Sequence, residues 1–498
     1  MWHGRQQRRC RAWLLLWCAA AALTSSAAAG GLSAAAKKKK KEEALVVTRS
    51  KNRAWRSSMK QMFHPIPESW GGGITCEDPL PSDDFVVAVA TDARDALPIF
   101  AVINSTVSNA VTLKRISFVV LVTHETRASL LELVRRFIPK KTRTGQFVHV
   151  SVCVGLDEQL TRRPAMMALA QLRNSTRVKR KELLSSFNFA AFYLPHILAA
   201  KRVLYLDSDV VVRGDVGELA HLHLRGRAAA AVEDCTQRLT RYVDFPLAET
   251  YRQAASRRVA AQAGDCAAAV ADAAAESAPP PHCEPAPRAL PPNNTCVFNR
   301  GVLLLNRHVW LKERVAERIE RLVVDFVHSR GVLFRAGVSQ PPFLLALAAR
   351  YFKLGAEWNV RGLGRDAVGH PEWAIIASHA RKNYLGFAGA EAGLSAHMRR
   401  VAQIRHARAL AQLRAQHRLG PHGKQGRHAG DASPYGDHLP YVCPFAAHAK
   451  ILHFNGEVKP WRMSRATVDD AEPGEGALCL WLDVRPKPRN QKVAPSDA

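Results

Sequence analysis

The stretch LYLDSDVVV, residues 204–212, decides the fold, because it places two carboxylates at the end of an apolar strand. Asp207 and Asp209 are two residues apart, so their side chains point the same way and can share one hard cation. Hydrophobic residues expected to be buried lie on both sides of the motif, and an uncompensated pair of buried carboxylates would be costly. A divalent metal is therefore the predicted partner of this pair.

Apolar runs rich in β-branched residues precede this stretch and alternate with segments of helical character. The predicted strands, buried on both faces, are residues 85–90, 116–122, 147–154 and 203–206, and the predicted helices are residues 98–111, 127–137 and 183–200. Strands that alternate with helices imply an α/β fold with a doubly wound, mostly parallel sheet. Ligands collect at the carboxyl ends of such strands, and acidic residues follow two of these ends, at Asp92 and Asp207.

The second half of the chain has a less regular pattern. An alanine-rich and then proline-rich stretch, residues 254–292, predicts a helix followed by an irregular connector. Residues 296–306 (CVFNRGVLLLN) predict either a strand pair or one strand with a sharp break at Gly301. Residues 309–328 predict a helix, and residues 450–453 predict a last apolar strand.

The excess of basic residues is concentrated in two blocks. Lys+Arg 71 against Asp+Glu 43 gives a formal charge of +28, and the basic residues cluster in residues 37–56 and 399–427. The second block lies in an expected exposed insertion, residues 381–449. No zinc-finger spacing, KH loop or RNA-binding aromatic signature accompanies the blocks, so solvated segments are favoured over a nucleic-acid site. Polyanion binding by residues 399–427 is the alternative, and it predicts an affinity that falls steeply with salt.

The N-terminus has the three parts of a secretory signal. Arginines precede the apolar run 12–23, and small residues follow at 27–29. A cleaved signal peptide and an uncleaved type II anchor both fit this segment. The polar, basic stretch at 37–60 resembles a stem and favours the anchor, whereas its run of lysines counts against the anchor because positive charge prefers the cytoplasmic side.

Sequons and cysteines agree with a compartment of the secretory pathway. N-glycosylation sequons begin at Asn104, Asn174 and Asn293. Eight cysteines lie beyond the targeting segment, and this even number permits disulfides in an oxidising compartment, with the pairing left open. No CxxC or Cys/His ligand spacing is present, which argues against a zinc site.

Residues 189–218 (FAAFYLPHILAAKRVLYLDSDVVVRGDVGE) resemble the core of family 8 glycosyltransferases, which include glycogenin-like, galacturonosyltransferase-like and glycosyltransferase-8-domain-containing proteins. Further blocks follow in the order of that family: residues 230–235 (AAVEDC), 298–302 (FNRGV), 358–364 (WNVRGLG) and 453–461 (HFNGEVKPW). The resemblance covers residues 82–240 and 294–465. It implies a GT-A type fold, a nucleotide-sugar-binding sheet flanked by helices.

The resemblance also implies a set of metal and nucleotide ligands. Asp207, Asp209 and His453 are expected to bind Mn²⁺, which in turn holds the diphosphate of a UDP-sugar. Carboxylate and imidazole groups suit Mn²⁺, and the cation neutralises the charge that builds on the departing UDP. Gly456 is expected to let the loop backbone approach the phosphates, and Lys459 to supply a further positive charge.

The remaining site residues carried over from the resemblance lie around the nucleoside and the sugar. Asp92 is expected beside the uracil and ribose, and Ser208 in the nucleotide site within the metal motif. Asp234 and Asn299 are expected to face the donor sugar as the candidate catalytic residues. Because family members retain anomeric configuration, Asp234 is a candidate for contact with the reacting centre, without being assigned as a nucleophile.

Two departures from the family pattern bear on activity. Ala191 stands where family members usually carry an arginine, and a methyl group cannot replace a guanidinium that clamps phosphate. Arg300, beside Asn299, is a candidate to compensate in space. Residues 339–342 (SQPP) stand where the family often has an Asp-Gln pair.

The predicted organisation is a signal peptide or anchor at 1–30, a basic stem at 31–75, a GT-A glycosyltransferase domain at 76–465 with insertions at about 252–293 and 381–449, and a tail at 466–498. The predicted function is metal-dependent, retaining transfer of a hexosyl or uronosyl group from a UDP-sugar to a glycan or glycoprotein acceptor in the Golgi or ER lumen. The expected partners are the nucleotide-sugar donor, a glycan or glycoprotein acceptor, for which an anionic chain is a candidate, and, if the N-terminal segment is uncleaved, the membrane. Nucleic acid is not expected.

The alternative function is that of a catalytically impaired family member that serves as a scaffold subunit of a transferase complex. Ala191 favours it, and the intact metal motif argues against it. The donor sugar stays open among glucose, galactose, xylose and galacturonate. A uronate donor requires an extra cation near the sugar, for which Arg300 is the candidate.

Overall fold

The structure is a computed structural model that describes residues 66–67, 70, 72–172, 181–261, 287–361, 367–369, 438–440, 449–456 and 459. The predicted N-terminal segment, most of the stem and of the two insertions, and the C-terminal tail lie outside these residues, so the predictions for them stay predictions. Within the described part of the chain, no helix is both long and apolar enough to cross a membrane.

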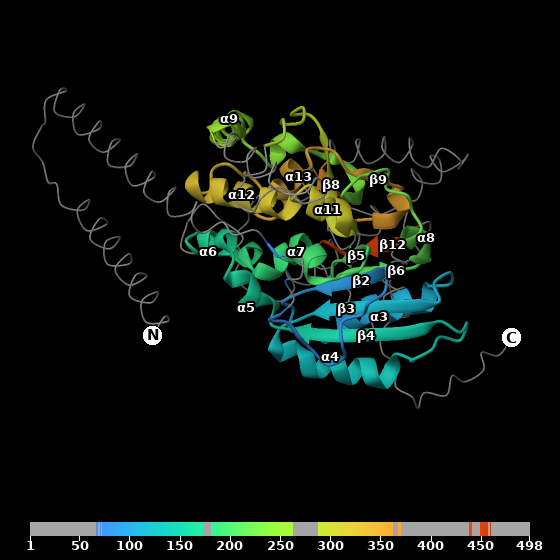
Figure 1. Ribbon diagram of the computed structural model, residues 1–498. Coiled ribbons are helices and arrows are strands. Elements are labelled where there is room, and N and C mark those ends of the chain that lie inside the picture. The colour runs from blue at the N-terminus through green and yellow to red at the C-terminus, as the bar shows by residue number, and fades with distance from the viewer. Residues whose placement is uncertain are drawn as a thin grey trace, which may run out of the picture. The chain divides into compact units, whose positions relative to one another are not determined.

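An eight-stranded sheet with the order β1-β4-β3-β2-β5-β8-β7-β9 forms the centre of the fold (Figure 1). Its strands are β1 (Thr75–Cys76), β2 (Phe85–Ala90), β3 (Arg115–Leu121), β4 (Phe147–Val154), β5 (Arg202–Leu206), β7 (Ala229–Arg238), β8 (Cys296–Asn306) and β9 (Phe352–Leu354). Strands β4, β3, β2 and β5 are parallel, whereas β8 runs antiparallel to both β5 and β7. The predicted α/β class with a mostly parallel sheet is confirmed.

Helices cover both faces of the parallel half. Val87 and Val89 of β2 share one buried cluster with Ile99 and Phe100 of α3 (Ala96–Asn109), and α4 (His124–Phe137) packs beside α3. Helix α7 (Ala190–Ile197) packs against β2 and β5 with side chains outside that cluster. β2 is buried on both faces because of this cover, which explains its unbroken apolar sequence.

The other helices are α5 (Leu156–Thr161), α6 (Pro164–Ala170), α8 (Gly217–Ala220), α9 (Phe245–Ala261), α11 (Arg307–Lys312), α12 (Val315–His328) and α13 (Gln340–Leu347). Two short antiparallel pairs complete the described structure: β6 (Val210–Val212) with β12 (Ile451–His453), and β10 (Ala367–Gly369) with β11 (His438–Pro440). The first of these pairs brings residues 451–453 to the predicted metal motif.

A buried ion pair fastens the helical layer that contains α7. Arg163, at the start of α6, donates from Nε and Nη2 to the two carboxylate oxygens of Glu320 on α12, each at 2.8 Å. The hydroxyl of Tyr193 on α7 donates to the same carboxylate at 2.8 Å. Because Glu320 is fully buried, these donors compensate its charge and hold three helices together.

Two predicted helices are divided in the structure, and the predicted break at Gly301 is a shift of register. The helix predicted at 183–200 is two 3₁₀ turns followed by the shorter α7, because the Ser185 side chain caps a new turn at the N–H of Phe187. The helix predicted at 309–328 is split into α11 and α12 at Arg314, whose φ of 50° is left-handed. β8 is one strand, and the predicted break lies within it: between the pairs Ala231–Leu303 and Glu233–Phe298 its ladder with β7 shifts register, so that residues 299–302, which include Gly301, lie opposite Val232 alone.

Two disulfides use four of the eight cysteines that lie beyond the targeting segment. Cys76 pairs with Cys153 across β1 and β4, and Cys235 pairs with Cys296 across β7 and β8. The sequence permitted disulfides without giving the pairing, because the partners are 77 and 61 residues apart and meet only through strand pairing.

Replacing Cys76 and Cys153 together with serine is expected to lower the free energy of unfolding by about 2–4 kcal/mol, because the bond closes a long loop in the unfolded chain. Urea denaturation of both proteins measures the difference. Peptide mapping under non-reducing conditions is the companion experiment, and free Cys76 and Cys153 thiols in the purified wild-type protein would contradict this pairing.

Candidate metal and donor site

The site is built where β5 passes into β6. β5 ends at Leu206, residues 207–209 form the turn, and β6 begins at Val210. β12 pairs antiparallel with β6 so that His453 lies opposite Val210, and the N–H of Phe454 donates to the carbonyl of Asp209 at 2.9 Å. Strand pairing therefore carries a histidine from near the end of the chain to the two aspartates.

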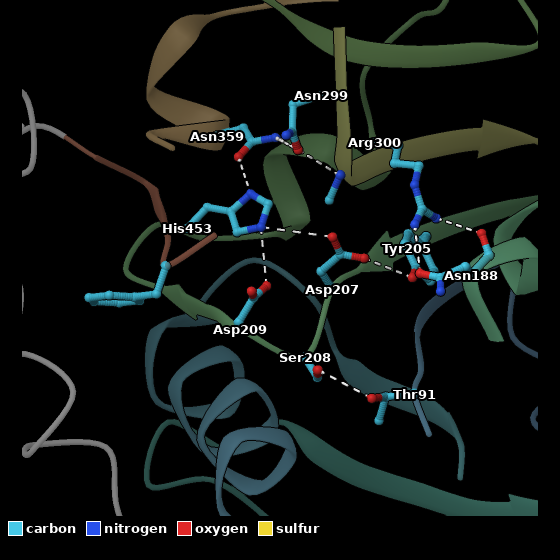
Figure 2. Close-up of polar contacts among 12 residues, drawn as sticks. Thr91, Asn188, Tyr205, Asp207, Ser208, Asp209, Asn299, Arg300, Asn359 and His453 are labelled. Atoms are coloured by element: carbon cyan, nitrogen blue, oxygen red, sulfur yellow. Dashed lines mark hydrogen bonds and ion pairs between the residues drawn. The ribbon is translucent and has the colours of Figure 1, made fainter. Parts of the chain in front are cut away.

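The three predicted metal ligands converge in space. His453 Nε2 lies 3.1 Å from Asp209 Oδ1 and 3.8 Å from Asp207 Oδ2, and one donor atom from each residue lies within 4.8 Å of the others. Figure 2 shows the imidazole facing both carboxylates. The His453 side chain is 2% exposed, whereas Asp207 and Asp209 keep 28% and 20% exposure, so an ion can still reach the carboxylates.

The second oxygen of each carboxylate is held by a donor of its own. The Tyr205 hydroxyl donates to Asp207 Oδ1 at 2.8 Å, and Lys459 Nζ donates to Asp209 Oδ2 at 2.8 Å. Burial and the charge of Asp207 raise the pKa of Tyr205 well above its ordinary value, so the phenol keeps the proton that it donates. These contacts leave Asp207 Oδ2 and Asp209 Oδ1 as the oxygens directed toward His453.

The neighbours of Asp209 lower the pKa of its carboxyl group. Burial acts to raise its pKa, but the neighbouring His453 and Lys459 outweigh burial and lower the pKa to about 2. The carboxylate is therefore available as an anionic ligand at neutral pH.

Gly301 makes room for this convergence. It lies on β8, where its carbonyl accepts the N–H of Asp207 at 2.8 Å. A Cβ at this position would lie 2.2 Å from His453 Cε1 and 2.8 Å from Asp207 Oδ2. Only glycine fits here, because the imidazole and the carboxylate occupy the volume that any side chain would need.

The donor set fits a divalent cation such as Mn²⁺. Two carboxylate oxygens and one imidazole nitrogen are suitable ligands for it. A second cluster in the described part of the chain, Glu233 with Cys235 and Cys296, is different in kind. Its two sulfurs are bonded to each other, which removes the thiolates that a soft metal would need.

The other predicted site residues occupy distinct places around the metal motif. The Ser208 hydroxyl lies 3.4 Å from that of Thr91, so the end of β2, where Asp92 follows, adjoins the motif. Asn299 lies on β8 beside Gly301 and accepts its N–H at 2.8 Å. Gly456 is buried three residues after His453.

Asp234 lies on β7, on the far side of β8 from the metal motif, and is 8% exposed. Its carboxylate forms an ion pair with the Arg361 guanidinium. The resemblance marks residues 358–364 only as a block of the family, so the sequence does not predict Arg361 as the partner of Asp234.

Arg300 lies close to the start of α7, the helix that contains Ala191. Its guanidinium donates to the Asn188 carbonyl at 2.8 Å and to Asn188 Oδ1 at 3.0 Å, and its positive charge acts on Tyr205 (Figure 2). Ala191 itself is 1% exposed in the first turn of α7. Arg300 thus reaches from β8 to the segment directly before α7.

Comparison with known proteins gives consistent results. The model of Glycosyl transferase family 8 matches residues 86–383. The chain is 30% identical over 193 residues to human Glycosyltransferase 8 domain-containing protein 2, a match that covers 37% of this chain and 48% of the relative. It is 28% identical over 191 residues to the Probable galacturonosyltransferase-like 3 of Arabidopsis thaliana, covering 38% and 44%. The matches thus span about half of the length of these relatives.

Solved structures with a similar chain trace include two glycosyltransferases. The galactosyltransferase LgtC in complex with donor and acceptor sugar analogs is 14% identical, with a TM-score of 0.38, covering 81% of this chain and 98% of LgtC. Mouse Xyloside xylosyltransferase 1 is 15% identical, with a TM-score of 0.36, covering 56% of this chain and 87% of that protein. Since the family model matches more than half of the residues, the chain belongs to glycosyl transferase family 8.

Proposed function

We propose that this protein is a metal-dependent, retaining glycosyltransferase that moves a hexosyl or uronosyl group from a UDP-sugar to a glycan or glycoprotein. The observation that carries the proposal is the convergence of Asp207 Oδ2, Asp209 Oδ1 and His453 Nε2. A bound Mn²⁺ would supply Lewis-acid stabilisation of the negative charge on the leaving diphosphate.

The residues of the chain have separate tasks in this proposal. Asp207, Asp209 and His453 hold the ion, and Lys459, 2.8 Å from Asp209 Oδ2, adds a fixed positive charge for the phosphates. Ser208 and Asp92 follow strand ends beside the nucleoside. Asp234 and Asn299 orient the donor sugar, with Arg361 holding the Asp234 carboxylate in place.

The setting of the reaction is part of the same proposal. The N-terminal targeting segment, cleaved or retained as a type II anchor, delivers the protein to the Golgi or ER lumen. The basic block 399–427 captures an anionic glycan acceptor, which predicts transfer that weakens with salt. The paired cysteines suit an oxidising lumen.

The second candidate function is a scaffold subunit that has lost catalysis. Buried Ala191 favours it, because α7 supplies no cation at that position. Both candidates predict a folded protein that binds a nucleotide, so only turnover separates them.

The experiment is a screen of UDP release by the purified lumenal protein across UDP-glucose, UDP-galactose, UDP-xylose and UDP-galacturonate, with and without Mn²⁺. The enzyme is expected to release UDP only when Mn²⁺ is present, most rapidly from one donor and more slowly from the others, and the Asp207→Ala/Asp209→Ala double variant is expected to release none. If the wild-type protein binds UDP but releases none from any donor, the result would support the function as a scaffold subunit.

Arg300 is expected to bind an anionic part of the donor. Its two hydrogen bonds to Asn188 use only part of the guanidinium's donors, and its charge reaches Tyr205 beside Asp207. Arg300→Gln is therefore expected to lower kcat/KM by about 10- to 100-fold, the loss typical of a hydrogen bond to a charged group. Steady-state kinetics with UDP-glucose and UDP-galacturonate measure the change.

Comparing the losses for the two donors identifies the anionic group that Arg300 contacts. A larger loss for UDP-galacturonate assigns Arg300 to the uronate carboxylate, and equal losses assign it to the diphosphate. Arg335→Gln is the matched control, because Arg335 is exposed and pairs with Asp244 at 2.9 Å, outside the site. Unchanged kinetics of Arg300→Gln with both donors would contradict an anion-binding role.

A further inference from the structure

The second nitrogen of the His453 ring has a buried partner. His453 Nδ1 lies 3.0 Å from Oδ1 of Asn359, a residue of the 3₁₀ turn Ala356–Asn359. Both residues are buried, at 1% and 4% exposure. The backbone holds them in register, since Val360 donates to the Ile451 carbonyl and His453 donates to the Val360 carbonyl, each at 2.9 Å.

Asn359 continues a chain of hydrogen bonds that begins at a backbone amide. The N–H of Gly301 donates to Asn299 Oδ1 at 2.8 Å, and Asn359 Nδ2 donates to the same oxygen at 3.2 Å (Figure 2). A backbone N–H can only donate. It therefore fixes Oδ1 of Asn299 as the acceptor, and this in turn directs the Asn359 amide nitrogen toward Asn299.

The direction of this chain determines the tautomer of His453. With its amide nitrogen turned to Asn299, Asn359 presents its oxygen to the ring, and this oxygen accepts a proton held on Nδ1. In the neutral ring, the form that binds a metal, the lone pair then resides on Nε2, the atom that faces Asp207 and Asp209 at 3.8 Å and 3.1 Å. A lone pair that faces two carboxylates is the arrangement that a cation requires.

We infer that Asn359 is a positioning residue of the metal site, which fixes the ring orientation and the Nε2 lone pair of His453 through the chain Gly301–Asn299–Asn359. The inference rests on the proposed metal-dependent function. Asn299 would then have a second role besides contact with the sugar, because its Oδ1 accepts the hydrogen bonds of both Gly301 and Asn359. Buried partners behind a ligating histidine typically change metal affinity by 10- to 100-fold when they are removed.

Two variants at one position isolate the oxygen that faces the ring. Asn359→Leu and Asn359→Asp both remove the N–H that donates to Asn299, but only aspartate keeps an oxygen opposite Nδ1. Asn359→Leu is expected to weaken Mn²⁺ binding by about 10- to 100-fold, and Asn359→Asp to recover most of that loss. Titration with Mn²⁺ alone, followed by the EPR signal of the free ion, gives the affinity, and thermal melting shows that each variant is folded.

The controls separate this inference from the proposed function. If the wild type binds Mn²⁺ no better than Asp209→Asn, the metal site itself is refuted. If the wild type binds Mn²⁺ better than Asp209→Asn, but folded Asn359→Leu matches the wild type, only the positioning role is overturned. Equal weakening by leucine and aspartate at position 359 overturns it too, because the effect would then come from the lost contact with Asn299.

Discussion

Replacing Gly301 with alanine is expected to lower kcat/KM for UDP-sugar turnover by at least about 100-fold, because displacing a site group by an ångström has an effect of that order. The added Cβ would lie 2.2 Å from His453 Cε1 and 2.8 Å from Asp207 Oδ2. The ring has no room to retreat, since it is buried and bonded to Asn359 behind it. Two of the three metal ligands would therefore move apart.

The effect of this single methyl group is measured by steady-state UDP release and by Mn²⁺ titration. Gly72→Ala is the matched control, because no atom lies within 4 Å of the Cβ that it adds, and it is expected to match the wild type. Thermal melting shows whether the variant is folded, so that a loss of activity caused by displaced metal ligands can be distinguished from a loss of the fold. A folded Gly301→Ala protein with wild-type Mn²⁺ affinity and turnover would contradict the geometry of the site.

Replacing Asp209 with asparagine is expected to remove detectable turnover and to weaken Mn²⁺ binding by more than about 100-fold. This loss exceeds the 10- to 100-fold typical of residues behind a ligand, because the ligand itself loses its charge. The wild-type carboxyl, with its pKa of about 2, is fully ionised at neutral pH. The change also removes the ion pair between Asp209 and Lys459, whose atoms lie 2.8 Å apart.

Asp215→Asn is the matched control for this variant. Asp215 is a carboxylate a few residues away that accepts the N–H groups of Val111, Thr112 and Gly217 at 2.9–3.2 Å. Burial acts to raise its pKa, but these hydrogen bonds lower it overall. Its stabilising effect is therefore present above the pKa of the unfolded state and is lost as the pH falls through the lower folded value.

The two variants should thus fail in different ways. Asp215→Asn is expected to melt at a lower temperature while keeping wild-type Mn²⁺ affinity, whereas Asp209→Asn is expected to lose the metal. Loss of Mn²⁺ binding in both would mean that the measured affinity reports the general fold rather than this site. Full activity of Asp209→Asn would contradict the assignment of Asp209 as a ligand.

The parallel half of the sheet was predictable from local pattern. Strands such as Phe85–Ala90 and Phe147–Val154 are buried on both faces or nearly so, and continuous β-branched runs are typical of that environment. The carboxylate pair was also visible, because Asp207 and Asp209 are neighbours in sequence. Both features depend on residues close together in the chain.

Features that arise from tertiary contacts were not visible in the sequence. The break between α11 and α12 depends on a left-handed arginine, Arg314, a conformation that no local pattern predicts. The link between Asn359 and His453 depends on the backbone pairing of Val360 with β12. The resemblance to the family placed His453 at the metal, but it did not indicate what holds the ring.

The most direct test of the central claim is anomalous diffraction from crystals grown with Mn²⁺ and UDP. We expect one manganese peak in contact with Asp207 Oδ2, Asp209 Oδ1 and His453 Nε2, and with the diphosphate oxygens of UDP. UDP bound without manganese at these three atoms, or a manganese peak elsewhere, would contradict the proposed metal-dependent site.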